Sequence, residues 1–425
     1  MSLLIKNAII VNADKIAKQP QDILIEKGII KKISLSIQDN KTKVIDAKGK
    51  LVFPGLIDMH VHFREPGQEH KETIESGIKS AAKGGFTAVM CMPNTIPVID
   101  NRSIAELIVS EAKRVGLINV FPIGAITKGQ KNEELTDMFE LRAAGCRALS
   151  DDGKCVTNSH LMRLAMEYAN MVGVLLIQHC EDHLLSAGSV MNEGINSTLL
   201  GVKGDPGLSE SVIVARDIEL ADYLGSRIHF AHMSLKRSVE LIRAAKARGI
   251  QVTAEATPHH FTLTDDELKE FNTCAKVNPP LRTKEDVEAL KEALCDGTID
   301  SIATDHAPHA KEDKETDLEH APCGMVGLET AVGLTITELV IPQVLSWPQM
   351  AEKMSTMPAK IMGLKSKGSI KEGFDGDITI IDPDKEWVVS EKDFVSKSTN
   401  SPFIGRTLMG RVDTTICGGK VVYHV

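Results

Sequence analysis

The stretch Asp58-Met59-His60-Val61-His62-Phe63-Arg64-Glu65-Pro66-Gly67 decides how the rest of the chain is interpreted. His60 and His62 are two residues apart, so in a β-strand their side chains project from the same face. Two imidazoles at one strand end can aim at a single point, as the ligands of a metal ion do. The apolar run 51–57 precedes them and predicts a buried strand. An isolated His-x-His pair is more often solvated, so the interpretation depends on further ligands.

Composition sets the class of protein. The 425 residues are 42% hydrophobic and 25% charged, which is typical of a globular chain with a sizeable core. This length predicts either a barrel or more than one domain. The net charge of −9 argues against nucleic acid or an anionic membrane as the main partner.

The expected location is the cytoplasm. No apolar run approaches the roughly 18 residues of a transmembrane helix. The first residues lack the pattern of a signal peptide. The eight cysteines are scattered without a Cys-x-x-Cys motif, which indicates reduced and mostly buried thiols.

A repeating pattern of apolar runs and helix-length amphipathic segments extends from residue 51 to about residue 362. The runs are 51–58, 86–92, 119–125, 147–150, 174–178, 227–231, 250–255 and 301–304. Alternating strands and helices imply a parallel sheet, and eight such units imply a closed (β/α)₈ barrel. We therefore assign residues 52–362 to a catalytic barrel.

Both ends of the chain contain shorter strand-like segments with turn signals, such as Gly418-Gly419. Each end is too small to carry a core of its own. The simplest assembly joins residues 1–51 and 363–425 in one small β-domain beside the barrel. The alternative is two unrelated flanking segments.

Metal-binding residue types follow the predicted strands at the edge where barrel enzymes carry their chemistry. They are His60 and His62 after the first run, Asp151 and Asp152 after the fourth, His179 after the fifth, His232 after the sixth and Asp305 after the eighth. A mixed set of imidazoles and carboxylates suits Zn²⁺, Mn²⁺ or Co²⁺. The set exceeds one tetrahedral ion, so we expect two ions that share a carboxylate.

The remaining histidines have other expected places. Surface or loop positions are predicted for His70, His160, His183, His320 and His424, and a packed core position for His229. His259 and His260 end the seventh run and either line the pocket or support the structure. His306 should face away from Asp305, because neighbours in an extended segment point to opposite sides.

With these residues assembled, the chain resembles the amidohydrolase superfamily and, within it, the long bacterial class of dihydroorotases. The matching motifs are 58–67, the stretch Met92-Pro93-Asn94-Thr95, and Ala303-Thr304-Asp305-His306-Ala307-Pro308-His309. The resemblance covers essentially the whole chain. It implies a (β/α)₈ barrel with a flanking β-domain, two divalent metal ions, most commonly Zn²⁺, and reversible cyclisation of N-carbamoyl-L-aspartate to L-dihydroorotate in pyrimidine biosynthesis.

The resemblance also assigns the metal ligands. One ion would be held by His60, His62 and Asp305, the second by His179 and His232, and Asp152 would bridge the two. The wider superfamily often bridges with a carboxylated lysine, but residues 147–152 contain no lysine. A direct aspartate bridge is similar to the long bacterial class. Asp151 is the alternative, and only one of the two aspartates can face the ions.

Substrate contacts follow from the same resemblance. They would come from His62, Arg64, Asn94, Asn278, His309, Cys323 and Gly324. Arg64, Asn94 and His309 would hold the substrate carboxylate, which a guanidinium matches in a bidentate manner. Asn278 and the backbone at Cys323 and Gly324 would contact the ring amides. The alternatives are a surface ion pair of Arg64 with Glu65 or Glu69, and an Asn-Pro turn at Asn278.

The implied mechanism has a bridging hydroxide attack the ring carbonyl, with Asp305 as general acid and base. Cyclisation reverses these steps. Two other readings remain: another cyclic amidohydrolase, namely an allantoinase or a dihydropyrimidinase, or an inactive homologue that serves as a partner subunit. The expected assembly is a homodimer, with an aspartate transcarbamoylase as a further candidate partner. The charged segment 310–324 is either a lid or a surface excursion.

Overall fold

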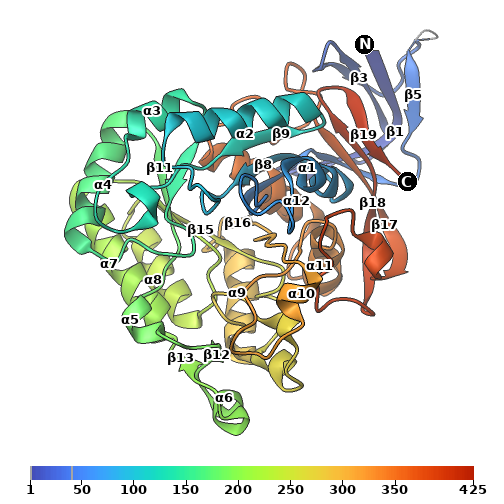
Figure 1. The fold of residues 1–425 in the computed structure, drawn as a ribbon. Coiled ribbons are helices and arrows are strands. Elements are labelled where there is room, and N and C mark those ends of the chain that lie inside the picture. Colours follow the sequence, from blue (N-terminus) through green and yellow to red (C-terminus); the bar gives the residue numbers. More distant parts are fainter. Residues whose placement is uncertain (1, 40–41) are drawn as a thin grey trace.

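Eight parallel strands form the centre of the computed structural model, which describes residues 2–39 and 42–425 (Figure 1). They are β7 (Leu56–Val61), β8 (Phe86–Cys91), β9 (Asn119–Pro122), β10 (Ala148–Ser150), β11 (Leu175–Gln178), β14 (Ile228–Phe230), β15 (Val252–Ala256) and β16 (Ser301–Ile302). β7 to β9 form one parallel sheet and β10 to β16 another. Single parallel bridges, Gly124 to Leu149 and Val61 to His306, join the two sheets on both sides. The strands therefore close the predicted (β/α)₈ barrel.

Helices surround the barrel as an outer ring in Figure 1. The longer ones are α1 (Ile74–Lys83), α2 (Arg102–Val115), α4 (Ser159–Val172), α7 (Leu208–Leu224), α8 (Lys236–Ala247) and α9 (Lys284–Asp296). Local sequence sets their bounds. The Asn101 side chain accepts hydrogen bonds from the first turn of α2, and Asn158 does the same for α4. Gly116 and Gly173 end these helices in the left-handed conformation that glycine adopts easily.

Shorter elements connect the barrel units. The α-helices are α3 (Met138–Ala143), α5 (His183–Ser186), α6 (Ile195–Leu200), α10 (Lys311–Lys314), α11 (Ala331–Thr335), α12 (Trp347–Ala351) and α13 (Met357–Ile361). The 3₁₀ turns are η1 (Lys128–Gln130), η2 (Asp265–Leu268), η3 (Thr273–Ala275) and η6 (Glu391–Asp393), and η4 (Ile336–Val340) and η5 (Glu352–Thr356) are π-helical. β12 (Met191–Asn192) and β13 (Gly204–Asp205) pair with each other and flank α6, which projects from the molecule in Figure 1.

Both ends of the chain lie in one sheet, as predicted. Its strands are β1 (Ser2–Asn12), β2 (Lys15–Ile16), β3 (Gln21–Glu26), β4 (Ile29–Ser34), β5 (Lys43–Asp46), β6 (Leu51–Pro54), β17 (Ile378–Val388), β18 (Thr407–Cys417) and β19 (Lys420–His424). The order is β19-β18-β17-β6-β1-β3-β4, with β2 and β5 also paired to β1. The joint sheet replaces the alternative of two unrelated flanks. The exact division of the chain at residues 51/52 and 362/363 stays a prediction.

The first predicted run, 51–58, is two strands rather than one. β6 pairs with β1 and β17 in the sheet of the chain ends, and β7 pairs with β8 in the barrel. Gly55 separates them, and a Cβ atom there would overlap the side chain of Thr87. Periodicity could not reveal this division, because strands in both sheets are buried and read as one continuous apolar run.

The inside of the barrel is filled by side chains, so it is a packed core rather than a pore. Its members come from alternate positions of the strands and from α13, and include Ile57, Met59, Ala88, Met90, Ile123, Ala148, Ile177 and Met362. A second apolar layer lies between the strands and the helix ring. In the described part of the chain, no helix has the length and apolar character needed to cross a membrane.

Candidate active site

The structure brings all six predicted metal-ligand side chains together at the C-terminal edge of the barrel. They lie at or just after the ends of β7, β10, β11, β14 and β16, and all are buried: His60, His62, Asp152, His179, His232 and Asp305. Residues far apart in the sequence meet here because the carboxyl ends of parallel strands share one edge of the barrel.

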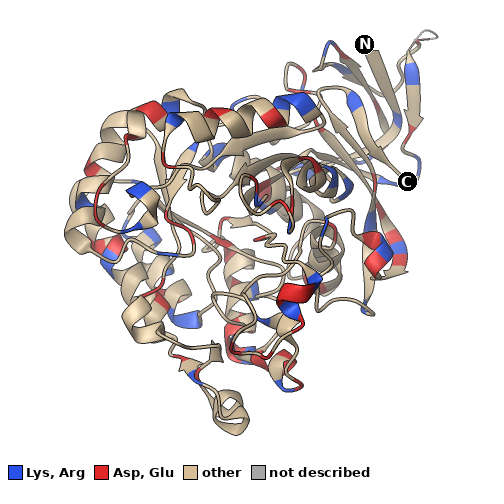
Figure 2. Ribbon diagram, viewed as in Figure 1, with Lys and Arg blue, Asp and Glu red and all other residues tan. Residues whose placement is uncertain are grey.

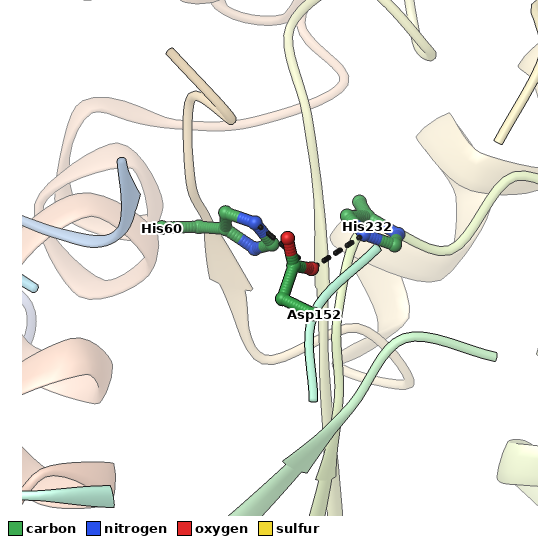
Figure 3. A group of neighbouring side chains, drawn as sticks. All are labelled: His60, Asp152 and His232. Atoms are coloured by element: carbon green, nitrogen blue, oxygen red, sulfur yellow. Dashed lines mark ion pairs between the residues drawn. The ribbon is translucent and has the colours of Figure 1, made fainter. Parts of the chain in front are cut away.

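Asp152 is the centre of this cluster. Its Oδ1 atom lies 3.3 Å from His60 Nε2 and 3.5 Å from His232 Nε2 (Figure 3). The same oxygen is 3.7 Å from His179 Nδ1, and Oδ2 is 3.6 Å from His62 Nε2. One carboxylate thus contacts four imidazoles. Burial acts to raise the pKa of Asp152, but His60 and the other histidines outweigh it and lower the pKa well below its usual value.

Asp305 closes the other side of the cluster. Its Oδ1 atom lies 3.0 Å from His62 Nε2 and 3.5 Å from His60 Nε2. Two groups of three residues therefore have donor atoms close enough to hold a metal ion, one with Asp152 and His232 and one with His62 and Asp305, and His60 belongs to both. This is the arrangement that a site for two neighbouring ions requires.

Outer hydrogen bonds fix the orientation of His60. Its Nδ1–H donates to Glu255 Oε1 at 2.9 Å, and Glu255 Oε2 accepts from His229 Nε2 at 3.1 Å. Because the proton is on Nδ1, the lone pair of His60 Nε2 points into the cluster. The carboxylate of Glu255 is buried, and the histidine partners hold its pKa at about 2 against the opposing effect of burial.

The same device orients two more imidazoles. His62 Nδ1–H donates to Asn94 Oδ1 at 2.8 Å, and His179 Nε2–H donates to Glu181 Oε2 at 3.0 Å. The opposite nitrogen of each ring carries its lone pair toward the cluster. Carboxylate and amide acceptors behind ligand histidines are typical of metal sites.

The polar atoms of the cluster fit a metal ion. His60 Nε2 and Asp152 Oδ1 are buried and form no hydrogen bond in the described structure. His179 Nδ1 and His232 Nε2 face each other at 2.9 Å. Buried polar atoms without partners are costly. A divalent cation would give His60 Nε2 and Asp152 Oδ1 the partner that they lack.

Backbone strain also occurs at this edge. Arg64, His232 and Asp305 have φ values of 56°, 34° and 47°, in the left-handed region that non-glycine residues rarely adopt. Such strain persists only where the surrounding structure holds it, and it gathers at functional sites. It turns these three side chains out of the regular strand direction.

Arg64 is a buried cation next to the cluster. Its Nε–H donates to the Pro308 carbonyl at 3.2 Å, and no carboxylate of the described chain lies within ion-pair distance of its guanidinium. Burial lowers the pKa of Arg64 to about 10, so the group is still charged at neutral pH. The alternative surface ion pair is wrong, because Glu65 accepts from Ile74 N and Glu69 from Gly67 N.

His309 lies against Arg64, with its Nε2 atom 3.3 Å from the guanidinium. Its Nε2–H donates to the Cys323 carbonyl at 2.9 Å, and its Nδ1 accepts from Lys71 Nζ at 3.3 Å. Burial and the cation Arg64 lower the pKa of His309 to about 2, so the ring is neutral. Lys71 was not predicted, since its proximity to His309 depends on the tertiary fold.

A cavity of about 240 Å³ opens beside the cluster, and Asn278, Glu181 and Cys323 are among the residues that line it. Asn278 Nδ2 donates to Glu181 Oε2 at 2.9 Å, so the predicted substrate residue contacts the partner of His179. Gly324 N–H donates to the Lys276 carbonyl at 2.9 Å. A Cβ atom on Gly324 would lie 2.8 Å from Ala307 Cβ, and its φ of 134° also requires glycine.

The structure separates Asp152 from its neighbour. Asp151 accepts hydrogen bonds from the backbone of Ile126 at 2.8 Å and Thr127 at 3.0 Å, and from the Thr127 hydroxyl. Its carboxylate is therefore fully used in holding the loop after β9. Only Asp152 of the pair enters the cluster.

The other histidines have structural places. His229 is buried against Glu255, as a core position requires, and His306 faces Glu72, away from the cluster. His260 Nε2–H donates to the Pro279 carbonyl at 2.9 Å, whereas His259 Nε2 is buried without a partner. The surface positions were predicted correctly for His70, His160, His320 and His424, and His183 is half-buried.

Three acidic residues at the site were missed. Asp58 accepts from Thr304 N at 3.1 Å and Thr304 Oγ1 at 2.6 Å, and thereby joins the first strand to the eighth. Glu255 ends the seventh apolar run, where a strand-end carboxylate could have been recognised. Glu181 is two residues after His179, so the spacing that pairs His60 with His62 was also a signal here.

A (β/α)₈ barrel with this cluster at its C-terminal edge defines a metal-dependent hydrolase of the amidohydrolase superfamily. A family model described as Dihydro-orotase-like matches residues 49–238, and one described as Amidohydrolase family matches residues 240–423. Curated dihydroorotases of Pelotomaculum thermopropionicum and Acetivibrio thermocellus are 53% and 52% identical to this chain, over 99% of its length and 98% of theirs. The chain belongs to the dihydroorotase family.

Solved structures agree on the fold. An L-hydantoinase (dihydropyrimidinase) from Arthrobacter aurescens has a TM-score of 0.88 and 27% identity, over 99% of this chain and 96% of that one. A D-hydantoinase (dihydropyrimidinase) from Thermus sp. has a TM-score of 0.82 and 28% identity, over 100% and 96%. The barrel and the flanking β-sheet are thus similar to those of enzymes that share the superfamily.

Proposed function

We propose that the protein is a dihydroorotase, which cyclises N-carbamoyl-L-aspartate to L-dihydroorotate and catalyses the reverse hydrolysis in pyrimidine biosynthesis. The observation that carries this proposal is the buried, unpaired guanidinium of Arg64 beside the His/Asp cluster. A buried cation needs an anionic partner, and both proposed substrates carry a carboxylate near the reacting carbonyl group. Full-length relatives at 50–53% identity support the same activity.

The cluster would hold two divalent ions, and Zn²⁺ suits its imidazole and carboxylate donors best. His60, His62 and Asp305 would hold one ion, His179 and His232 the other, and Asp152 would bridge them. Bound ions supply a Lewis acid and a water of lowered pKa. Support comes from the central place of Asp152, which contacts four histidines within 3.7 Å.

Three side chains would hold the substrate carboxylate. Arg64 supplies the charge, and the single N–H of the neutral His309 ring would exchange its bond to the Cys323 carbonyl for one to the substrate carboxylate. Asn94 can donate from its amide nitrogen while its oxygen holds His62. This arrangement places the reacting carbonyl at the cluster, because carboxylate and ring are parts of one rigid substrate.

The ring amides would meet the wall of the cavity formed by Asn278 and Cys323. Asn278 has an amide group that can exchange its bond to Glu181 for one to the substrate. The Gly324 N–H already donates to the Lys276 carbonyl. The substrate would therefore contact the Gly324 carbonyl, which also accepts a hydrogen bond from Asn400 Nδ2.

Asp305 would move the proton. In hydrolysis its carboxylate accepts a proton from the attacking water and delivers it to the ring nitrogen that leaves. In cyclisation Asp305 takes the proton of the attacking nitrogen and, in this protonated form, gives it to the departing oxygen. Its carboxylate lies 3.0 Å from His62, and its strained backbone keeps it at the inner wall of the cluster.

The likeness to hydantoinases keeps a dihydropyrimidinase activity as the alternative. The rings that such an enzyme hydrolyses lack the carboxylate that Arg64 would bind, and this argues against it. An inactive partner subunit is less well supported, since none of the six ligand residues is replaced. The test uses purified protein with its metal content measured on the same sample. We expect turnover of dihydroorotate and none of allantoin or dihydrouracil; the opposite preference would overturn the assignment.

For the assembly, we propose a homodimer that works in the cytoplasm, with an aspartate transcarbamoylase as a further partner. Support for association is the projecting α6, where Ile195 and Leu199 are 80% and 76% exposed. Exposed apolar residues that gather on one element are typical of interfaces. Light scattering tests this: Leu199→Lys should shift a dimer toward monomer, and a monomeric wild type would contradict it.

A further inference from the structure

The segment 310–324 follows directly after His309 and covers one side of the cavity. It begins with α10, whose four residues are all charged (Figure 2). From the sequence, this charged segment is either a lid or a surface excursion. In the structure Lys314 is only 4% exposed, and Lys276, which lies across from the segment, is only 5% exposed. Two lysines are thus buried where the segment meets the barrel.

The hydrogen bonds of the Lys314 ammonium all go to backbone carbonyls. Its Nζ donates to Pro322 O at 2.7 Å, Thr273 O at 3.0 Å and Lys276 O at 3.4 Å. Its own carbonyl accepts from Thr273 Oγ1 at 2.6 Å. Burial lowers the pKa of Lys314 to about 8, so the group is still mainly an ammonium at neutral pH.

Lys276 makes the reciprocal contacts. Its Nζ donates to Leu318 O at 2.7 Å and Glu319 O at 3.1 Å, and its carbonyl accepts from Gly324 N–H. No carboxylate of the described chain lies within ion-pair distance of Lys276 or Lys314. A buried ammonium satisfied only by carbonyls holds them firmly, because each broken bond leaves a buried polar group without a partner.

These bonds fix the residues on both sides of Cys323. Pro322 is held by Lys314, and Gly324 is held by the backbone of Lys276. Cys323 between them lines the cavity, and its carbonyl accepts from His309 Nε2–H at 2.9 Å. The two lysines therefore determine where the cavity wall stands and how the ring of His309 is oriented beside Arg64.

We propose that Lys314 and Lys276 are positioning residues that fasten segment 310–324 to the barrel, so that Cys323 completes the substrate cavity and orients His309. The segment is a fixed wall rather than a mobile lid. The effect on substrate binding rests on the proposed function. The fastening itself does not, so the two are tested by separate measurements.

The test compares Lys314→Met with the matched control Lys311→Met. Lys311 lies in the same short helix, but its side chain is 80% exposed and pairs only with Glu315. In Lys314→Met we expect amide hydrogen exchange at residues 315–324 to rise about tenfold, since the segment then opens locally. We expect KM for dihydroorotate to rise about tenfold, with kcat within about threefold of the wild type. Lys311→Met should change neither.

Equal exchange in the two variants would overturn the fastening. Faster exchange with KM unchanged and kcat lowered would overturn the positioning role. If Lys314→Met does not fold, Thr273→Val replaces it: this change keeps the side-chain size and removes only the bond to the Lys314 carbonyl. It should loosen the segment in the same direction by a smaller factor. Exchange is measured without turnover, so an inactive protein with a fastened segment would refute only the proposed function.

Discussion

The two edges of the barrel differ in the exposure and pairing of their charged residues. At the N-terminal edge, a cavity of about 990 Å³ lies against the sheet of the chain ends, and its arginines, such as Arg147 and Arg227, are exposed. Its carboxylates are neutralised, since Lys367 Nζ lies 2.9 Å from Asp375 and 2.5 Å from Asp377. At the C-terminal edge the cavity is only about 240 Å³, and the charges are buried.

This difference shows that unsatisfied buried groups locate the chemistry better than the size of a cavity does. Exposed charges are stabilised by water and gain little from a further partner. Arg64 and the cluster around Asp152 are buried without a complete set of protein partners, so we expect a bound ion and substrate to complete them. Four substitutions test the contrast, from the largest expected effect to the smallest.

Asp305→Asn should have the largest effect. The amide keeps the size of the side chain but cannot accept the proton, so we expect kcat to fall about 10³-fold, within the range of general acid–base catalysis. Because Asp305 is also a proposed metal ligand, the assay contains excess metal, and atomic emission on the same sample measures the metal content. Near-normal turnover with full metal content would contradict the role of Asp305.

Arg64→Ala should weaken substrate binding. Hydrogen bonds to charged groups contribute about 1.5–3 kcal/mol, which corresponds to roughly a 10- to 100-fold rise in KM for dihydroorotate. Steady-state kinetics measure it, and the melting temperature and metal content of the variant serve as the controls. A lowered melting temperature or metal content with KM unchanged would show that Arg64 supports the fold and not the substrate carboxylate.

Glu255→Gln should reduce metal affinity about tenfold, at the lower end of the range for groups behind metal ligands. The amide still contacts His60 and His229 but no longer polarises either ring. Competition with a chelator measures the affinity. Asp151→Asn is a matched control for the removal of a buried carboxylate, because Asp151 holds a loop and contacts no ligand histidine.

Arg227→Gln at the opposite edge should have the smallest effect. The side chain is exposed, and no ion pair of it is found in the described chain. We expect kcat, KM and metal content to remain within about twofold of the wild type. A larger change in any of them would mean that the N-terminal edge also contributes to the reaction, and the contrast between the edges would have to be abandoned.

Much of this site could be predicted, because residues that follow the strands of a barrel in sequence lie together at its C-terminal edge. Each ligand from His60 to Asp305 follows an apolar run, and the rule that chemistry lies at strand ends brought them together without any coordinates. The same rule would have found Glu255. Glu255 was not predicted, because it contacts the ligand histidine His60 and is not itself a ligand residue.

Other features depend on contacts that periodicity does not encode. Lys71 meets His309 across 238 residues, and the pairing comes from the approach of two loops. Lysine is usually a surface residue, but the surrounding fold buries Lys314. The separation of β6 from β7 was hidden for the opposite reason, since two buried strands look the same in sequence.

The bond between Asp58 and Thr304 has a consequence for how the enzyme is made. It joins residues 246 positions apart and lies directly beneath His60 and Asp305. Contacts of such long range form late, because the chain entropy lost in closing them is large. A chain on the ribosome therefore cannot assemble the complete set of six side chains until the eighth strand has emerged, because Asp305 follows that strand. The full cluster comes together only in a barrel that has already closed.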